Sequence, residues 1–265
     1  MDTHPGDPKS HSIYGDLLLQ EKKYPEARVS FLKVLALDSS KYIVWEQLLR
    51  LDLQLGDYQH LFDYSQRTFE LFPEQPLPYL FSGLACYQLK KFEEGIRSLN
   101  SGLKLVVSND EMLAQFYMYL GDTYHALQQD ENAFISYEQS LKINGNNAYV
   151  LNNYAYYLTL RGRDLEKAER MAKKAVEIEP RNSSFQDTYG WIFYKQGKYS
   201  EALEWIGKSL EDKEGVSSEV LEHYGDVLFR LGDTGRAYEY WVKAKKKGGG
   251  SSFLEQKLAE KKLYE

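Results

Sequence analysis

A small residue that recurs about every 34 positions is the feature that most restricts how this chain can fold. Most copies follow an apolar residue, and each is paired with a second small residue twelve or thirteen positions later. The first members are Gly15, Gly83, Gly121, Ala155, Gly190 and Gly225, and their partners are Ala27, Gly95, Ala133, Ala168, Ala202 and Ala237. A period of this length is typical of a protein built from stacked supersecondary units.

The residues around each pair of small positions predict a helix, a turn and a second helix. Around Gly190, apolar residues recur at the i, i+3, i+4, i+7 spacing of a helix on both sides of the turn Gly197-Lys198-Tyr199. A small residue at the crossing allows two helices to approach closely. Such a hairpin buries its apolar faces only against neighbouring hairpins, so we expect an all-α solenoid.

The unit around Gly190 resembles the tetratricopeptide repeat almost position for position. The residues that carry the resemblance are Tyr189-Gly190, Phe193, Gly197-Lys198-Tyr199, Glu201-Ala202, Ile206 and Leu210, with Pro73 and Pro180 matching the proline that closes such repeats. The resemblance implies a right-handed superhelical solenoid of about seven hairpins, and it favours a bacterial protein. We place the repeats near residues 8, 42, 76, 114, 148, 183 and 218, so that they cover residues 8–251.

The two ends of the chain lie outside these repeats. Residues 1–7 are expected to be disordered or to come from an expression vector, and we expect the chain to have been cut from a longer solenoid, because no capping helix precedes the first repeat. Gly248-Gly249-Gly250 breaks the last hairpin, and residues 252–265 predict a C-terminal capping helix. Its Leu254 and Leu258 are expected to face the stack, and its water-facing side is expected to carry Glu255, Lys257, Lys261 and Lys262.

Composition and spacing disfavour several classes of function. A net charge of −6 and a pI near 5.5 disfavour nucleic-acid binding, which needs a positive surface. The single Cys86 excludes an intramolecular disulfide, and the five histidines lack the spacing of metal ligands. No nucleophile, base and orienting group fall together on one turn or face. We therefore expect no enzyme activity, no cofactor and no metal.

The sequence leaves the compartment open. No apolar run is long enough to span a bilayer, so direct insertion into a membrane is not expected. The N-terminus has neither the basic flank nor the apolar core of a secretory signal. We expect a soluble protein of the cytoplasm, or of the periplasm if an upstream signal was removed.

The resemblance also implies where a partner would bind. In such repeats the first helix of each hairpin lines a groove, chiefly through its second, fifth, ninth, twelfth and thirteenth positions. In the C-terminal half these positions combine aromatic rings with polar and charged residues, a surface suited to anchoring an extended peptide. The candidate partner-binding residues are Asp122, Tyr149, Asn152, Tyr156, Asp187, Trp191, Tyr194, Lys195, Asp226, Phe229 and Arg230.

The sequence therefore predicts a non-catalytic protein–protein interaction scaffold that binds a partner segment in its groove. Charges beside the rings favour an apolar or aromatic peptide that carries basic residues. Alternatively, the rings pack within the stack. Two other functions stay open: a structural component of a bacterial envelope assembly that docks large partners by its edges and ends, and a regulatory fragment of a larger enzyme. The identity of the protein or peptide partner and the oligomeric state stay open.

Overall fold

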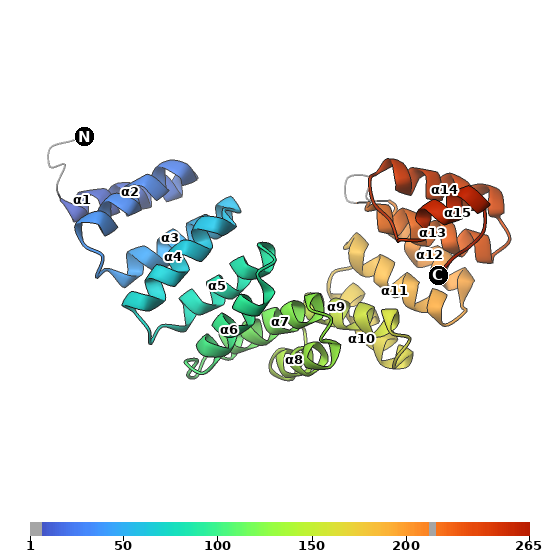
Figure 1. Ribbon diagram of the computed structural model, residues 1–265, viewed down its shortest axis with the longest axis horizontal. Helices are drawn as coiled ribbons and strands as arrows, with labels where there is room; N and C mark the ends of the chain where they lie inside the picture. Colours follow the sequence, from blue (N-terminus) through green and yellow to red (C-terminus); the bar gives the residue numbers. More distant parts are fainter. Residues whose placement is uncertain (1–6, 212–215) are drawn as a thin grey trace. The chain divides into compact units, whose positions relative to one another are not determined.

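The computed structural model describes residues 7–211 and 216–265, which form helices and, within those ranges, no strand. The chain divides into two compact units, and the boundary lies between Asn144 and Gly145. Each unit is a row of helical hairpins, the first drawn in blue to green and the second in yellow to red (Figure 1). The predicted all-α hairpin fold is confirmed. Of residues 1–7, which we expected to be disordered, all but Asp7 lie outside the described residues.

The described part of the first unit contains four hairpins. Their helices are α1 Pro8–Gln20, α2 Tyr24–Leu37, α3 Tyr42–Leu55, α4 Tyr58–Leu71, α5 Pro76–Gln88, α6 Phe92–Leu103, α7 Asp110–Ala126 and α8 Asp130–Ile143. Each hairpin packs its two helices together and packs against the next hairpin of the unit. Their core includes the fully buried Phe31, Leu48, Leu61, Leu99 and Phe116.

A buried ion pair joins two hairpins of the first unit. The guanidinium of Arg28 on α2 lies 2.8 Å from a carboxylate oxygen of Asp52 on α3, and the Asp52 side chain is inaccessible to solvent. Burial raises the pKa of Asp52 to about 6, although the positive charge of Arg28 opposes that shift. The stability of the first unit should therefore depend on pH through the Asp52 carboxyl group.

The second unit contains three hairpins and a short final helix. Its helices are α9 Ala148–Leu160, α10 Leu165–Ile178, α11 Ser183–Lys195, α12 Tyr199–Ser209, α13 Ser218–Arg230, α14 Thr234–Lys246 and α15 Leu254–Glu260. The helix α15 packs against α14 and is shorter than the predicted segment 252–265. It ends where Lys261 adopts a left-handed backbone conformation, with φ of 51°.

Glycines allow the close helix crossings that the sequence predicted. A Cβ added to Gly190 on α11 would lie 2.5 Å from Cγ1 and 2.9 Å from the backbone nitrogen of Ile206 on α12. A Cβ added to Gly225 on α13 would lie 2.6 Å from Cδ1 of Trp241 on α14. Real Cβ atoms do not approach other atoms so closely, because interiors are already densely packed. The glycines therefore fix the spacing within these hairpins.

The first helices of the three hairpins in the second unit begin at matched side-chain caps. The side chains of Asn147, Asn182 and Ser217 accept hydrogen bonds from the backbone amides three residues later, at distances of 3.1, 3.3 and 3.2 Å. The helix α11 packs against both α9 and α13. We call the surface shared by α9, α11 and α13 the inner face.

Candidate functional site

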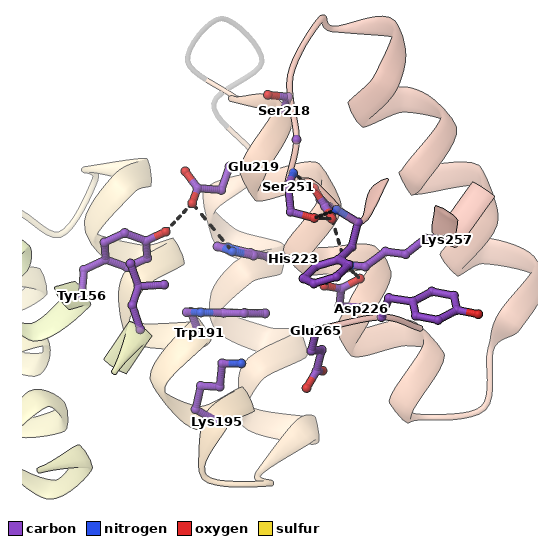
Figure 2. Close-up of a pocket in the computed structure, with 15 residues that line it drawn as sticks. Tyr156, Trp191, Lys195, Ser218, Glu219, His223, Asp226, Ser251, Lys257 and Glu265 are labelled. Carbon is purple, nitrogen blue, oxygen red and sulfur yellow. Dashed lines mark hydrogen bonds and ion pairs between the residues drawn. The ribbon is translucent and has the colours of Figure 1, made fainter. Parts of the chain in front are cut away.

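A cavity of about 420 Å³ lies on the inner face of the second unit. It is lined by side chains of α9, α11 and α13 and by the C-terminal segment, residues 250–265 (Figure 2). Tyr156, Trp191 and Asp226 are each the ninth residue of their helix, and Leu160 and Lys195 are each the thirteenth. Because the caps align the starts of the three helices, equivalent repeat positions come together around one cavity.

Three aromatic rings stack on one another, and two of them, Trp191 and His223, line the cavity. The indole of Trp191 lies between the imidazole of His223, at 3.8 Å between ring centroids, and the phenol of Tyr194, at 4.4 Å. The Lys195 ammonium lies 5.0 Å from the centroid of the Trp191 ring, within the range of a cation–π contact. The Trp191 Nε1 is buried and has no hydrogen-bond partner among the described residues. This part of the cavity lining therefore contains a hydrogen-bond donor whose acceptor the described chain does not supply.

A buried carboxylate holds one of these rings in place. Asp187 on α11 and His223 on α13 are both more than nine-tenths buried, and His223 Nδ1 lies 3.0 Å from the nearer carboxylate oxygen. Burial alone would lower the pKa of His223, but the charge of Asp187 and its hydrogen bond outweigh burial and raise it. The pair therefore favours a charged imidazolium stacked against Trp191.

Another part of the cavity lining contains a buried lysine from α15. The Lys257 ammonium lies 2.8 Å from a carboxylate oxygen of Glu222 and 2.7 Å from one of Asp226, and all three side chains are almost fully buried. Asp226 also accepts a hydrogen bond of 2.8 Å from Trp241 Nε1. The prediction that Lys257 faces water is therefore wrong, because the two carboxylates on α13 need a cation and this lysine supplies it.

The pKa values of the two carboxylates in this cluster, Glu222 and Asp226, are shifted in opposite directions. Burial would raise the pKa of Glu222, but hydrogen bonds from Lys257 and Ser251 outweigh it and lower that pKa. Burial raises the pKa of Asp226, and the charge of Lys257 only partly opposes that increase. The single ammonium thus does not fully compensate two buried carboxylates.

Two further carboxylates close the cavity. Glu219 accepts a hydrogen bond from the hydroxyl of Tyr156, and Glu265 accepts one from the hydroxyl of Tyr194. Glu265 also lies 3.2 Å from the guanidinium of Arg230. Lys195 makes no ion pair with a described carboxylate, and burial lowers its pKa. Among the described residues that line the cavity, Lys195 is therefore a cation that remains available to a ligand.

The candidate residues predicted from the sequence differ in how far they are exposed. Tyr149, Lys195 and Arg230 are exposed, and Tyr156 and Phe229 are half-buried. The buried members are Asp122, Asn152, Asp187, Trp191, Tyr194 and Asp226. The cavity brings together four of the candidates, which are Tyr156, Trp191, Lys195 and Asp226.

Two buried aspartates occupy the same repeat position and make the same contact within their own hairpins. Asp122 belongs to the first unit, where it accepts a hydrogen bond of 2.6 Å from the hydroxyl of Tyr137 on α8. Asp226 accepts the corresponding bond from Trp241, which also lies fifteen residues further along the chain. Both aspartates therefore tie the first helix of a hairpin to its second helix.

Sequence reasoning missed the part of the cavity that the C-terminal segment forms. Ser251, Phe253, Lys257, Tyr264 and Glu265 all line it. The available signal was the pair of acidic residues Glu222 and Asp226, one helical turn apart on a face predicted to be inner. Such a pair calls for a cation, but the sequence alone does not say which lysine reaches it.

The described residues contain few other features that point to chemistry. Within residues 7–211 and 216–265, no three histidine, cysteine or acidic side chains are grouped so that they could hold a metal ion. In the same ranges no helix has the length and apolar character required to cross a membrane. Cys86 is buried, and burial raises the pKa of its thiol to about 11, which keeps it protonated at neutral pH.

Comparison with known proteins places this fold in a family. A family model described as a tetratricopeptide repeat matches residues 114–147, which span most of α7 and all of α8. The crystal structure of a tetratricopeptide repeat protein from Parabacteroides merdae is similar with a TM-score of 0.71 at 15% identity, over 96% of this chain and 98% of that one. Residues 114–147 therefore match a tetratricopeptide repeat, and the chain has the fold of a tetratricopeptide repeat protein.

Two further proteins are similar to this chain over different shares of its length. An uncharacterized protein named ycf37 from Pyropia yezoensis is 27% identical over 148 residues, which are 54% of this chain and 80% of that protein. A chain in the Cut9–Hcn1 hetero-tetramer of the APC/C is similar with a TM-score of 0.75 at 12% identity, over 98% of this chain and 53% of that one. The tetratricopeptide fold supports a general role as a protein–protein interaction scaffold.

Proposed function

We propose that this tetratricopeptide repeat protein is a non-catalytic scaffold that binds a segment of a partner protein on the inner face of its second unit. The observation that carries the proposal is the cavity at which equivalent positions of three repeats meet. A cavity of about 420 Å³ is large enough to take an anchoring side chain with part of its backbone. Buried aromatic anchors in such cavities commonly dominate the affinity of protein interfaces.

The unpartnered indole nitrogen supports a peptide ligand. A buried donor without an acceptor costs about 1–3 kcal/mol, and an oxygen brought by a ligand would remove that cost. A carbonyl oxygen of the partner's backbone is suited to pair with Trp191 Nε1. Lys195, at the same cavity, would orient the segment through a carboxylate or a second carbonyl group.

The candidate residues of the second unit would serve the proposed contact surface in two roles. The exposed and half-buried Tyr149, Tyr156, Lys195, Phe229 and Arg230 would contact the partner directly. The buried candidates of the second unit would hold the rings and charges in position. Asp122 would play the supporting role on the corresponding helix of the first unit.

Site-specific photocrosslinking tests this proposal. A photoreactive benzoylphenylalanine replaces Lys195 on the inner face in one protein, and in a matched control it replaces Lys173 on α10, where the lysine is 62% exposed. We expect benzoylphenylalanine in place of Lys195 to form a covalent adduct with a partner in an extract of the source cells. The same residue in place of Lys173 should form none.

The same experiment separates the rival functions. Adducts at Lys173 without adducts at Lys195 would contradict groove binding and favour an assembly component that docks by its outer surfaces. Adducts of equal yield at both positions would indicate nonspecific capture and would also contradict the proposal. An adduct between Lys195 and a catalytic domain would favour a regulatory role.

A further inference from the structure

The C-terminal segment occupies the inner face in the manner of a bound ligand. Its helix α15 places Lys257 between two carboxylates of α13, and the lysine side chain is only 3% exposed (Figure 2). Ser251, just before α15, donates from its backbone nitrogen and its hydroxyl to Glu222. Lysine is rarely buried so completely in proteins unless it is paired.

Apolar contacts flank the buried lysine on the same segment. Leu254 is 4% exposed and belongs to a core cluster with Leu228 and Trp241. Leu258 and Leu263 are partly buried against the same cluster. The segment therefore presents a lysine among leucines to an acidic pair among apolar residues.

The connection that carries this segment is suited to let it detach. It consists of Gly248-Gly249-Gly250, and the φ angles of Gly248 and Gly250 are 87° and 133°. Glycine-rich connections behave as flexible linkers. Within the seven-residue α15, Leu254 and Lys257 are the buried side chains, so the attachment of this helix depends strongly on the Lys257 ion pairs.

We propose that Glu222 and Asp226 form a lysine-binding subsite, that residues 251–265 are its internal occupant, and that a partner segment with a lysine flanked by apolar residues binds by displacing them. This inference rests on the proposed function, because it names the chemistry of the partner at that site. The acidic pair requires a cation, since buried carboxylates without one are strongly destabilising. The net charge of −6 favours the approach of a basic segment over an acidic one.

The unpartnered donor provides a second reason to expect an external ligand. The internal occupant satisfies Glu222 and Asp226 but leaves Trp191 Nε1, in the same cavity, without an acceptor. A longer segment that follows the inner face would reach both features once the side chains that cover Trp191 Nε1 move aside. Residues 251–265 therefore satisfy the acidic pair but not the indole nitrogen. A ligand that pairs with both can replace them.

Linkage to the chain sets how strongly the internal segment competes. A short flexible linker gives an effective concentration on the order of 1 mM, roughly a hundredfold above a peptide added at about 10 µM. A peptide with the same sequence should therefore bind poorly to the native chain. It should bind well to a chain whose own segment has been released.

A labelled synthetic peptide of residues 250–265 is the probe, and its fluorescence anisotropy reports binding. The full-length proteins are the native chain, Lys257→Glu, and the control Lys262→Glu, which makes the same change in charge at an exposed position of the same segment. We expect the peptide to bind Lys257→Glu at least tenfold more tightly than the native chain or the control. A peptide with Lys257→Met should bind Lys257→Glu at least tenfold more weakly than the native peptide.

Equal binding to all three proteins, no binding to Lys257→Glu, or equal binding of the two peptides would each overturn the inference. Amide hydrogen exchange of Lys257→Glu provides a second test that does not depend on the peptide. We expect faster exchange in residues 251–265 with α13 and α14 still protected. Loss of protection throughout α13 and α14 would show that residues 251–265 are a structural cap required for folding. That result would also overturn the inference.

The outcomes distinguish this inference from the proposed function. If the peptide tests fail while Lys195 still crosslinks to a partner, the groove binds a partner without the lysine subsite. If the peptide tests succeed while Lys195 captures nothing, the subsite serves the chain's own segment and groove binding of a partner is contradicted.

Discussion

Replacement of Gly190 by alanine should destabilise the second unit through overpacking. The added Cβ would lie 2.5 Å from Cγ1 of Ile206, whereas carbon atoms prefer separations of about 3.5–4.0 Å, so α11 and α12 must move apart by about 1 Å. Because the backbone nitrogen of Ile206 is also within 2.9 Å, a change of side-chain rotamer cannot relieve the clash. Overpacking costs about 1–3 kcal/mol, and alanine returns about 1 kcal/mol of helix propensity. We expect a net loss of up to about 2 kcal/mol.

Gly207→Ala on α12 is the matched control. A Cβ added to Gly207 would meet Tyr224 at 3.6 Å, which is ordinary contact, so this variant should gain up to about 1 kcal/mol of helix propensity. Urea denaturation followed by far-UV circular dichroism measures both free energies of unfolding. Equal stabilities, or a Gly190→Ala protein more stable than Gly207→Ala, would refute the idea that helix spacing at this crossing depends on glycine.

Three further predictions concern charge and local stability. The pKa of Asp52, raised from 3.8 to about 6 on folding, favours the protonated folded state, so denaturation should show the native chain losing stability relative to Asp52→Asn as pH rises from 4 to 6. A pH-independent difference would contradict this. In Asp187→Asn, an NMR titration should show a lower pKa for His223, because burial then acts without the opposing carboxylate; an unchanged value would remove Asp187 as the cause. The helix α1, whose Ile13 is 62% exposed, should exchange amide hydrogens fastest among the helices of the first unit, and uniform protection there would argue against low contact density.

The hairpin fold could be predicted because its physical cause is local in the sequence. Each crossing needs a small residue such as Gly190 on one helix and Ala202 on the next, and the two are twelve residues apart. Helical spacing of apolar residues then determines which faces are buried. The same spacing places Tyr156 and Trp191 at the ninth position of their helices and Lys195 at the thirteenth.

The burial of Lys257 could not be predicted because it depends on tertiary contacts. Its position next to Leu258 and three residues after Leu254 places it beside the apolar face of α15, where a lysine stem often lies while its ammonium reaches water. In this chain the ammonium instead reaches Glu222 and Asp226, which are more than 30 residues earlier. Sequence patterns describe which face of a helix is apolar, but not which charges a distant helix presents to it.

The role of the Trp191 ring also depends on a neighbouring repeat. Its position predicted the inner face, and the ring does line the cavity there. Its burial comes from stacking on His223, which belongs to the next hairpin. Truncation of Trp191 would therefore change the packing between repeats as well as any contact with a partner, which makes Lys195 the better position for testing binding.

Amide hydrogen exchange of the chain with and without a partner identified by crosslinking tests the central claim most directly. If the partner binds the inner face, protection should increase in α9, α11 and α13, and residues 251–265 should exchange faster as they are displaced. Increased protection confined to α10, α12 and α14, with residues 251–265 unchanged, would contradict both the site and the displacement of its internal occupant.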